Sequence, residues 1–234
     1  MLIKKFKKNK NMLLELDHIY KWVTTGGRRT FLLNDLSLKV EEGEFISIMG
    51  PSGSGKSTLL NVIGMLDGFQ EGEYKFLDET IHNMKEKHRS KLYKEYIGFV
   101  FQQYHLIDEL TVYENIETPL LYKKIKSAER KALVGDMLDR FNIVGKKDLF
   151  PNQLSGGQQQ LVGIARALIS KPKLILADEP TGNLNSKQSD EIMQLFKQLN
   201  EEDGVTIIQA THSESNAAYA SKTINLLDGS ISKS

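Results

Sequence analysis

The sequence predicts an α/β fold with a mainly parallel sheet, because short apolar stretches of strand length alternate with longer stretches of helical periodicity. The apolar stretch at residues 44–49 leads into a glycine-rich loop, and leucines and isoleucines follow that loop at helical spacing. Later strands are expected at residues 173–177 and 205–210, each followed by polar residues and a helix. Strands that alternate with helices in this way are typical of parallel sheets.

The glycine-rich loop at residues 50–58 reads GPSGSGKST and fits the phosphate-binding pattern G-x-x-x-x-G-K-(S/T). Glycines let the backbone wrap closely around an anion, and the amides at a helix start point toward it. Lys56 can reach the terminal phosphates of a nucleotide, and the Ser57 hydroxyl can bind Mg²⁺. A glycine turn with a chance match is the alternative. The strand before the loop and the helix after it favour a nucleotide site in a P-loop NTPase core.

Size and composition favour one large domain, or a core with a subdomain. A chain of 234 residues with 40% hydrophobic and 26% charged residues can bury a full core and is ordinary for a soluble protein. The net charge of +1 gives no indication of a nucleic-acid partner. The sequence has no cysteine, which excludes disulfides and cysteine metal sites. No apolar run approaches the roughly 18 residues that span a bilayer, so a membrane partner is expected to be a separate chain.

The first 11 residues are expected to form a basic tail, and residues 12–232 the folded domain. A solvated tail is the expected state, and contact with a membrane surface is the alternative. No apolar run of about 7–15 residues follows, so the segment does not resemble a signal peptide. The tail carries Lys4, Lys5, Lys7, Lys8 and Lys10.

The first part of the domain is expected to form an N-terminal antiparallel β subdomain. Alternating apolar residues at 13–46 predict strands around a turn at 24–29, and residues 72–81 predict another edge strand.

The segment at roughly residues 103–160 is too long for a simple connection and is expected to be an inserted helical subdomain. Thr111 and Glu114 fit a capping box, so a helix should begin there, and Pro119 should kink or end it. A second helix is expected at residues 127–141. Its expected apolar face consists of Ala128, Ala132, Leu133, Met137, Leu138 and Phe141.

Two acids, Asp178 and Glu179, follow the strand expected at residues 173–177. Ligands bind at the carboxyl ends of strands in open α/β sheets, so these acids should meet the phosphate loop. One acid can hold the Mg²⁺ shell, and the other can orient or deprotonate the attacking water. An acidic strand end that caps the next helix is the alternative.

A second glycine-rich turn, at residues 155–157, also opens a helix and offers its amides to an anion. Because the first loop already holds the phosphates of one nucleotide, this turn is expected to contact a nucleotide held by another subunit. The alternative is an N-cap in which Ser155 serves its own helix.

Five motifs in this order resemble the ATP-binding subunit of an ABC transporter over about residues 12–232. They are the phosphate loop, Gln102 after a strand, LSGGQ at 154–158, LILADEP at 174–180 and His212 after a strand. The resemblance implies that Glu179 is the general base and that His212 contacts the γ-phosphate beside Lys56. It also implies a head-to-tail homodimer with two ATP sites.

The same resemblance implies the remaining contacts. Ser57 and Gln102 would bind Mg²⁺, with Asp178 holding a water in its shell. The phosphates of ATP would be bound by Gly50, Pro51, Ser52, Gly53, Ser54, Gly55, Lys56, Ser57 and Thr58. The ATP of the second subunit would be covered by Ser155, Gly156, Gly157 and Gln158.

Three segments are similar in sequence to the branch of the family that serves lipoprotein release and macrolide export. They read IGFVFQQYHLIDELTVYENI, PNQLSGGQQQ and ADEPTGNL. That branch implies a permease partner with a large extracytoplasmic domain, and a peripheral place on the cytoplasmic face of the inner or plasma membrane. Val23 stands where the family usually has an aromatic residue against adenine, so Trp22 is the expected adenine contact, although strand alternation could turn it away. Leu161, Gly163, Asn185 and Ser213 also depart from the usual pattern.

Two other functions remain open at this point. A regulatory ABC ATPase of the cell-division type would have the same motifs. A soluble ABC ATPase that acts on DNA or ribosomes usually carries two cassettes or a long coiled-coil insertion, and this sequence has one cassette and no sustained heptads.

Overall fold

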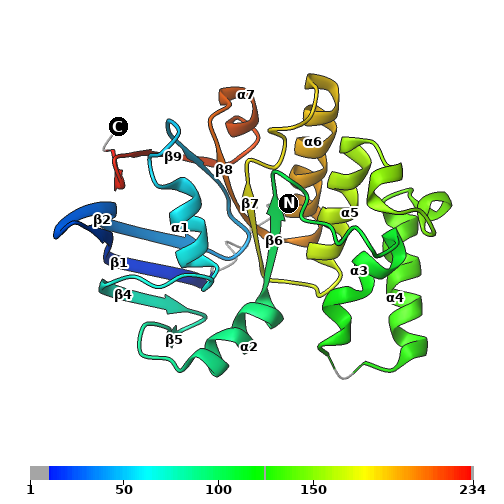
Figure 1. Cartoon of the computed structure of the whole chain (residues 1–234), viewed down its shortest axis with the longest axis horizontal. Coiled ribbons are helices and arrows are strands. Elements are labelled where there is room, and N and C mark those ends of the chain that lie inside the picture. Colours follow the sequence, from blue (N-terminus) through cyan, green and yellow to red (C-terminus); the bar gives the residue numbers. More distant parts are fainter. Residues whose placement is uncertain (1–10, 124, 233–234) are drawn as a thin grey trace, which may run out of the picture.

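A computed structural model describes residues 11–123 and 125–232, and the expected basic tail lies almost wholly outside them. Its strands form a four-stranded antiparallel sheet and a six-stranded sheet, in the orders β2-β1-β4-β5 and β10-β9-β3-β8-β7-β6 (Figure 1). The strands are β1 (Met12–Thr25), β2 (Arg28–Glu41), β3 (Phe45–Met49), β4 (Glu71–Phe76), β5 (Glu79–Thr80), β6 (Ile97–Phe101), β7 (Leu174–Asp178), β8 (Thr206–Thr211), β9 (Lys222–Leu227) and β10 (Ser230–Ile231).

In the six-stranded sheet every neighbouring pair is parallel except β9 and β10, which confirms the predicted fold class. The helices are α1 (Lys56–Ile63), α2 (Glu86–Tyr96), α3 (Val112–Leu121), α4 (Ser127–Arg140), α5 (Gly156–Leu168), α6 (Ser186–Asp203) and α7 (Glu214–Ala217), with short 3-10 turns at Val144–Lys146 and Pro151–Gln153.

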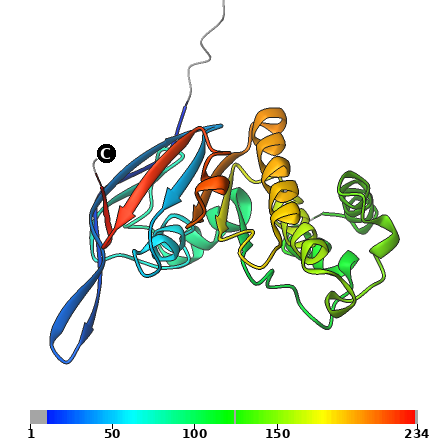
Figure 2. The ribbon, with the colours of Figure 1, turned by 90° about the horizontal axis from the view of Figure 1, so that it is seen from above.

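The strands β3, β6, β7 and β8 of the parallel sheet are buried on both faces, which explains their apolar runs, whereas the residues of β9 alternate between exposed and buried. Along β7, Leu174 and Leu176 pack into a cluster with α1 and the antiparallel sheet. The alternate residues Ile175 and Ala177 pack into a second cluster with the helices α3 to α6. Figure 2 shows α6 and α5 on the side of the sheet away from the antiparallel strands.

The start of α3 confirms the predicted capping box. The Glu114 backbone N–H donates to the Thr111 hydroxyl over 3.2 Å, and the Glu114 carboxylate accepts from the Thr111 backbone N–H over 2.8 Å. The helix runs two residues past Pro119 and ends at Leu121. The division of the chain into a core and a helical subdomain at 103–160 stays a prediction.

Three local expectations differ from the structure. Residues 72–81 form a hairpin, β4 and β5, and not one edge strand, because Leu77 and Asp78 adopt left-handed turn conformations with φ of 49° and 62°. Ala128 and Ala132 of α4 are exposed, and the buried positions of that helix are Val134 and Leu138.

The helix α2 was not predicted. Its sequence EKHRSKLYKEY is polar nearly throughout, and Leu92 is its buried residue. Apolar periodicity cannot reveal a helix that places so little apolar surface in the core. In the described ranges, no helix combines the length and the apolar character that crossing a membrane requires.

Candidate active site

A cleft of about 690 Å³ lies at the carboxyl ends of the parallel strands. Because β3, β6, β7 and β8 run in the same direction, the loops that follow them meet at one edge of the sheet. The cleft is lined by Leu32, Ser52, Gly53, Gly55, Lys56, Ser57, Thr58, Gln102, Asp178, Glu179 and His212.

Lys56 is held beneath the phosphate loop by the loop itself. The residue is 8% exposed, and its Nζ donates to the carbonyl oxygens of Gly50 over 2.8 Å and Pro51 over 3.0 Å. The loop therefore presents a pre-positioned ammonium group and a row of helix-start amides to the same cleft. This combination is suited to the phosphates of a nucleotide.

Two glycines of the loop allow a matched test of its shape. Gly53 and Gly55 both have positive φ, +80° and +102°. A Cβ at Gly55 would lie 2.6 Å from the carbonyl oxygen of Leu32, whereas a Cβ at Gly53 would meet nothing within 4 Å.

We therefore expect Gly53→Ala to lower the free energy of unfolding by about 1–2 kcal/mol, the cost of a left-handed alanine. Gly55→Ala should cost at least about 1 kcal/mol more, because the backbone oxygen must move. Urea unfolding of both variants checks the difference. Equal losses would contradict the close approach of Leu32 to the loop.

Asp178 lies at the end of β7, and its Oδ1 is buried without a hydrogen-bond partner. Burial raises the pKa of Asp178, and the nearby Ser57 hydroxyl opposes that shift. A carboxylate and a hydroxyl at the edge of a phosphate site are donors that Mg²⁺ takes, and a hydrated cation would satisfy the unpaired oxygen. The residues present therefore fit this ion.

Glu179 adopts a left-handed backbone conformation with φ of 44°, which is unusual for a residue with a side chain. Its backbone N–H donates to the Ala210 carbonyl over 3.0 Å, which holds the strained turn. Its carboxylate Oε1 lies 2.9 Å from Nδ1 of His212. The structure thus joins two residues that the sequence placed at the ends of separate strands, and this pair fixes the direction of the Glu179 side chain.

Gln102 is held by a residue that sequence reasoning missed. Asn183 donates through Nδ2 to the Gln102 carbonyl over 2.9 Å, and its Oδ1 accepts from Gln102 Nε2 over 3.3 Å. Next to it, a Cβ at Gly182 would lie 2.7 Å from that same Nε2. The one available signal was the position of Gly182 and Asn183 in the loop just after the two acids.

The second glycine-rich turn does not line the cleft. Ser155 caps α5, since its Oγ accepts from the Gln158 backbone N–H over 3.4 Å and its own N–H donates to Gln158 Oε1 over 3.0 Å. The capping alternative is therefore present in the structure, and Ser155 remains exposed. Whether this turn also contacts a nucleotide of a second copy stays a prediction.

Trp22 also lies outside the residues that line the cleft. Its ring packs edge-on against Phe31, with centroids 5.6 Å apart, and the Arg29 guanidinium lies 4.5 Å from its centroid. Both neighbours belong to β2 beside the hairpin tip that projects from the molecule in Figure 2. The adenine contact of Trp22 stays a prediction.

The chain matches known proteins over most of its length. Residues 33–182 match a family profile described as ABC transporter. The chain is 44% identical over 219 residues to the ABC transporter ATP-binding protein MJ1508 of Methanocaldococcus jannaschii, covering 94% of this chain and 97% of that protein.

The macrolide export ATP-binding/permease protein MacB of Chlorobium phaeobacteroides is 44% identical over 224 residues. That match covers 94% of this chain and 33% of MacB, so the chain spans one third of that relative. Among solved structures, the ATP-binding cassette MJ0796, dimeric and bound to ADP and Pi, superimposes with a TM-score of 0.88 at 43% identity. The superposition covers 94% of this chain and 97% of that one.

Proposed function

The chain belongs to the ABC transporter family, and from this premise we propose that its ATP sites form between two copies arranged head to tail. It is the ATP-binding and ATP-hydrolysing motor subunit of a transporter. The observation that supports the dimer is the separation of the site into two parts. One cleft holds the phosphate loop, both acids and His212, while the exposed helix start at Ser155 lies outside it. A second copy can bring its own helix start to this cleft, and the relative MJ0796 is a dimer.

In the proposed site the residues of this chain divide the work. The loop amides and Lys56 hold the phosphates, and Glu179 orients the attacking water and accepts its proton. His212 holds the Glu179 carboxylate over 2.9 Å and lies exposed at the mouth of the cleft, where a γ-phosphate would meet it.

Mg²⁺ would be held by Ser57 and Gln102, with Asp178 binding a water of its shell, and would neutralise charge on the phosphates. The buried, unpaired Oδ1 of Asp178 supports this assignment. The helix-start residues Ser155, Gly156, Gly157 and Gln158 would then close over the γ-phosphate from the second copy.

The proposed partner is a membrane permease with a large extracytoplasmic domain, contacted at the cytoplasmic face of the membrane. The MacB relatives are named macrolide export ATP-binding/permease proteins, so their names place an ATP-binding part and a permease in one protein. In the proposed assembly the permease is a separate chain. The transported compound is one that the cell exports or handles in its envelope.

A cross-link tests the head-to-tail arrangement, because the sequence has no cysteine that would interfere. We expect Ser52→Cys and Ser155→Cys chains, mixed with ATP and Mg²⁺, to be joined by a short bis-maleimide. Each cleft would then lie opposite the helix start of the other copy. Either variant alone should stay unlinked, since its two cysteines would lie at different sites of the dimer. Linking of Ser155→Cys with itself, or no linking in the mixture, would contradict the arrangement.

A further inference from the structure

A series of polar contacts leads from β8 to the turn that carries Glu179, and it begins at Gln209. Gln209 lies in β8 and is fully buried. An amide in such a place is costly unless it forms hydrogen bonds. Its Nε2 donates to the Ser47 hydroxyl of β3 over 2.6 Å and to the Asn216 carbonyl of α7 over 2.9 Å. Gln209 therefore holds α7 against the parallel sheet.

The helix α7 begins two residues after His212 and consists of Glu214–Ala217. A helix this short has little stability of its own, so its contacts with the rest of the fold decide where it lies. The residue before it, Ser213, donates its backbone N–H to the Thr211 hydroxyl over 3.1 Å and caps the helix. The position of α7 is therefore linked to that of His212.

The side chain of Asn216 joins α7 to the turn after β7. Its Nδ2 donates to the Thr181 hydroxyl over 2.6 Å. Thr181 is buried and lies two residues after Glu179, in a turn where the Gly182 backbone N–H donates to the Glu179 carbonyl over 3.0 Å. Glu179 and His212 are thus joined directly over 2.9 Å and also through Thr181 and Asn216.

We propose that Asn216 is a positioning residue for ATP hydrolysis, which acts through Thr181 to hold the Glu179 carboxylate within reach of the attacking water. The inference rests on the proposed role of Glu179 as general base. The left-handed conformation of Glu179 persists only where its surroundings enforce it, and the buried Asn216–Thr181 contact is part of those surroundings.

The direct contact with His212 is less suited to hold the turn, because the His212 side chain is 70% exposed and lies at the mouth of the cleft. A general base acts only within hydrogen-bond reach of the proton that it takes. A displacement of about 1 Å can lower the rate about 10²-fold. A contact that fixes the backbone of the turn therefore bears directly on the rate of hydrolysis.

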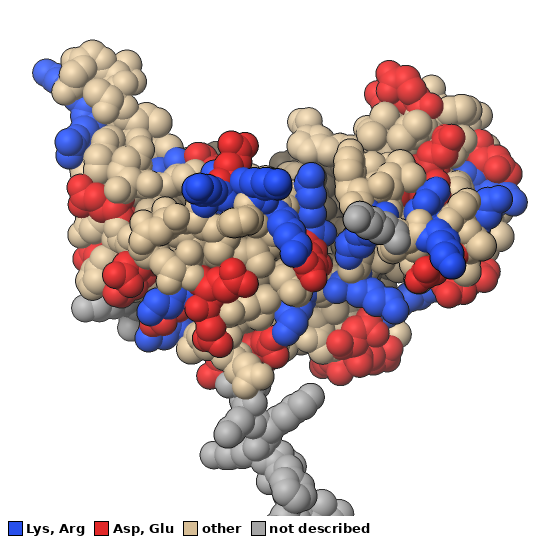
Figure 3. Space-filling view, turned by 90° about the horizontal axis from the view of Figure 1, so that it is seen from below, with Lys and Arg blue, Asp and Glu red and all other residues tan. Residues whose placement is uncertain are grey.

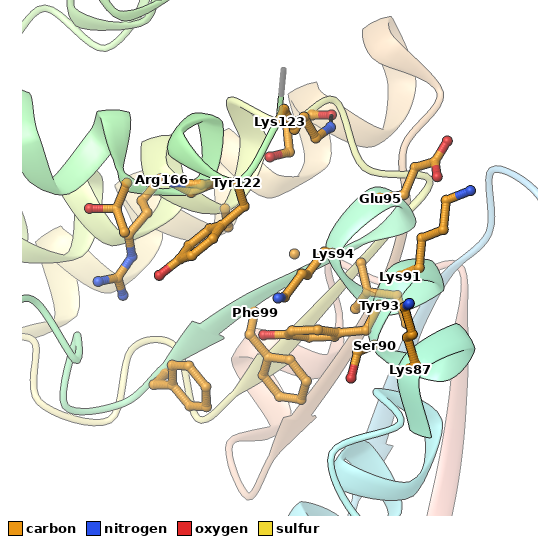
Figure 4. Close-up of a pocket in the computed structure, with 17 residues that line it drawn as sticks. Lys87, Ser90, Lys91, Tyr93, Lys94, Glu95, Phe99, Tyr122, Lys123 and Arg166 are labelled. Carbon is orange, nitrogen blue, oxygen red and sulfur yellow. Dashed lines mark hydrogen bonds between the residues drawn. The ribbon is translucent and has the colours of Figure 1, made fainter. Parts of the chain in front are cut away.

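Another cavity, of about 780 Å³, lies away from the nucleotide cleft between α2, β6 and the helices α3 and α5. Figure 4 shows Arg166 and Tyr122 on one side of it and Tyr93 and Lys94 on the other. Figure 3 shows lysine and arginine side chains along the middle of this face. The residues that join α7 to the turn after β7 do not line this cavity, so their effect can be measured on the isolated chain.

The test compares Asn216→Leu in chains with and without the base. Leucine is similar in size to asparagine and cannot donate to Thr181. We expect the hydrolysis rate, measured per bound ATP so that unfolded chains do not count, to fall at least about tenfold. In the Glu179→Gln chain the same substitution should change the residual rate less than about twofold, because no base is left to position. A loss by the same factor in both chains would overturn the inference.

Variants of Thr181 test the contact from its other side. Thr181→Val keeps the shape and removes the hydroxyl, so it should slow hydrolysis as much as Asn216→Leu does. Thr181→Ser keeps the hydroxyl and should restore a rate within about twofold of the unaltered chain. The combined Thr181→Val and Asn216→Leu chain should be no slower than either single variant, since both remove one hydrogen bond. Losses that multiply would overturn the proposed contact.

Asn200→Leu is the matched control. The Nδ2 of Asn200 also joins two segments, donating to the carbonyls of Gly43 over 3.0 Å and Val205 over 2.8 Å. These residues precede β3 and β8, at the edge of the sheet opposite the cleft. The rate per bound ATP should therefore equal that of the unaltered chain. An equal loss in the Asn200→Leu and Asn216→Leu chains would mean that Asn216 only supports the fold, and would overturn the inference.

The outcomes separate this inference from the proposed function. If the Glu179→Gln chain hydrolyses ATP at the unaltered rate, the proposed role of Glu179 is wrong and the inference falls with it. If that chain is slow while the Asn216→Leu chain keeps the unaltered rate, the inference alone is wrong.

Discussion

We expect Glu179→Gln to reduce ATP hydrolysis by about 10²–10⁴-fold or more, the usual contribution of a general base, while ATP binding persists. The substitution keeps the shape of the side chain and removes the group that accepts a proton from water. An amide can still contact His212 over the present 2.9 Å, so the turn after β7 should remain in place. Bound ATP should then persist between two copies, and gel filtration with ATP and Mg²⁺ should show a dimer.

Glu191→Gln serves as the control for this experiment. Glu191 is an exposed acid of α6 that does not line the cleft. The Glu191→Gln chain should therefore hydrolyse ATP at the same rate as the unaltered chain. A Glu179→Gln chain that stays monomeric at saturating ATP and Mg²⁺ would count against the two-copy site. An unchanged rate of ATP hydrolysis in the Glu179→Gln chain would show that Glu179 is not the general base.

Lys56→Ala should weaken ATP binding by about 100-fold or more, because the phosphates lose charge-assisted hydrogen bonds worth about 1.5–3 kcal/mol each. Lys56 approaches the site from below the loop, with its ammonium already placed by the carbonyls of Gly50 and Pro51. Little ordering is therefore needed when the phosphates bind, and this preorganisation is lost together with the charge. Titration with a fluorescent ATP analogue measures the change.

Lys123→Ala is the matched control, since Lys123 also donates to a backbone carbonyl, that of Ser170 over 3.0 Å, far from the cleft. Its nucleotide affinity should be unchanged. Circular dichroism shows whether both variants are folded. Equal affinities in the folded Lys56→Ala and Lys123→Ala chains would mean that the loop amides alone hold the phosphates.

Some departures from the family pattern have a local explanation in the structure. Asn185 stands where the family usually has Asp, and its Oδ1 accepts from the Gln188 backbone N–H over 2.9 Å at the start of α6. Asn and Asp are about equally good at this capping position, so the helix is retained. Leu161 is partly buried and packs against the helical cluster. Ser213 stands where Asp is common, and its Oγ accepts from the Asn216 backbone N–H over 3.3 Å at the start of α7, a cap that Ser and Asp form about equally well. Nothing in the structure explains why Gly163 replaces the more usual residue.

Local residue patterns are enough to predict the parts of this protein that depend on neighbours a few residues apart. The phosphate loop needs glycines at two positive-φ positions, and the capping box of α3 joins Thr111 to Glu114. The buried strands of the parallel sheet show as apolar runs. Each of these follows from local backbone preference and burial, so a pattern of residues suffices to predict it.

Contacts between side chains that are distant in the sequence could be identified from the folded chain alone. The Gln102–Asn183 contact joins residues 81 positions apart, and the Arg166–His105 contact joins residues 61 apart. Such pairs depend on strand order and helix packing, which single-residue patterns do not contain. The same reason explains the errors at α2 and α4, because the apolar face of a helix is defined by what packs against it.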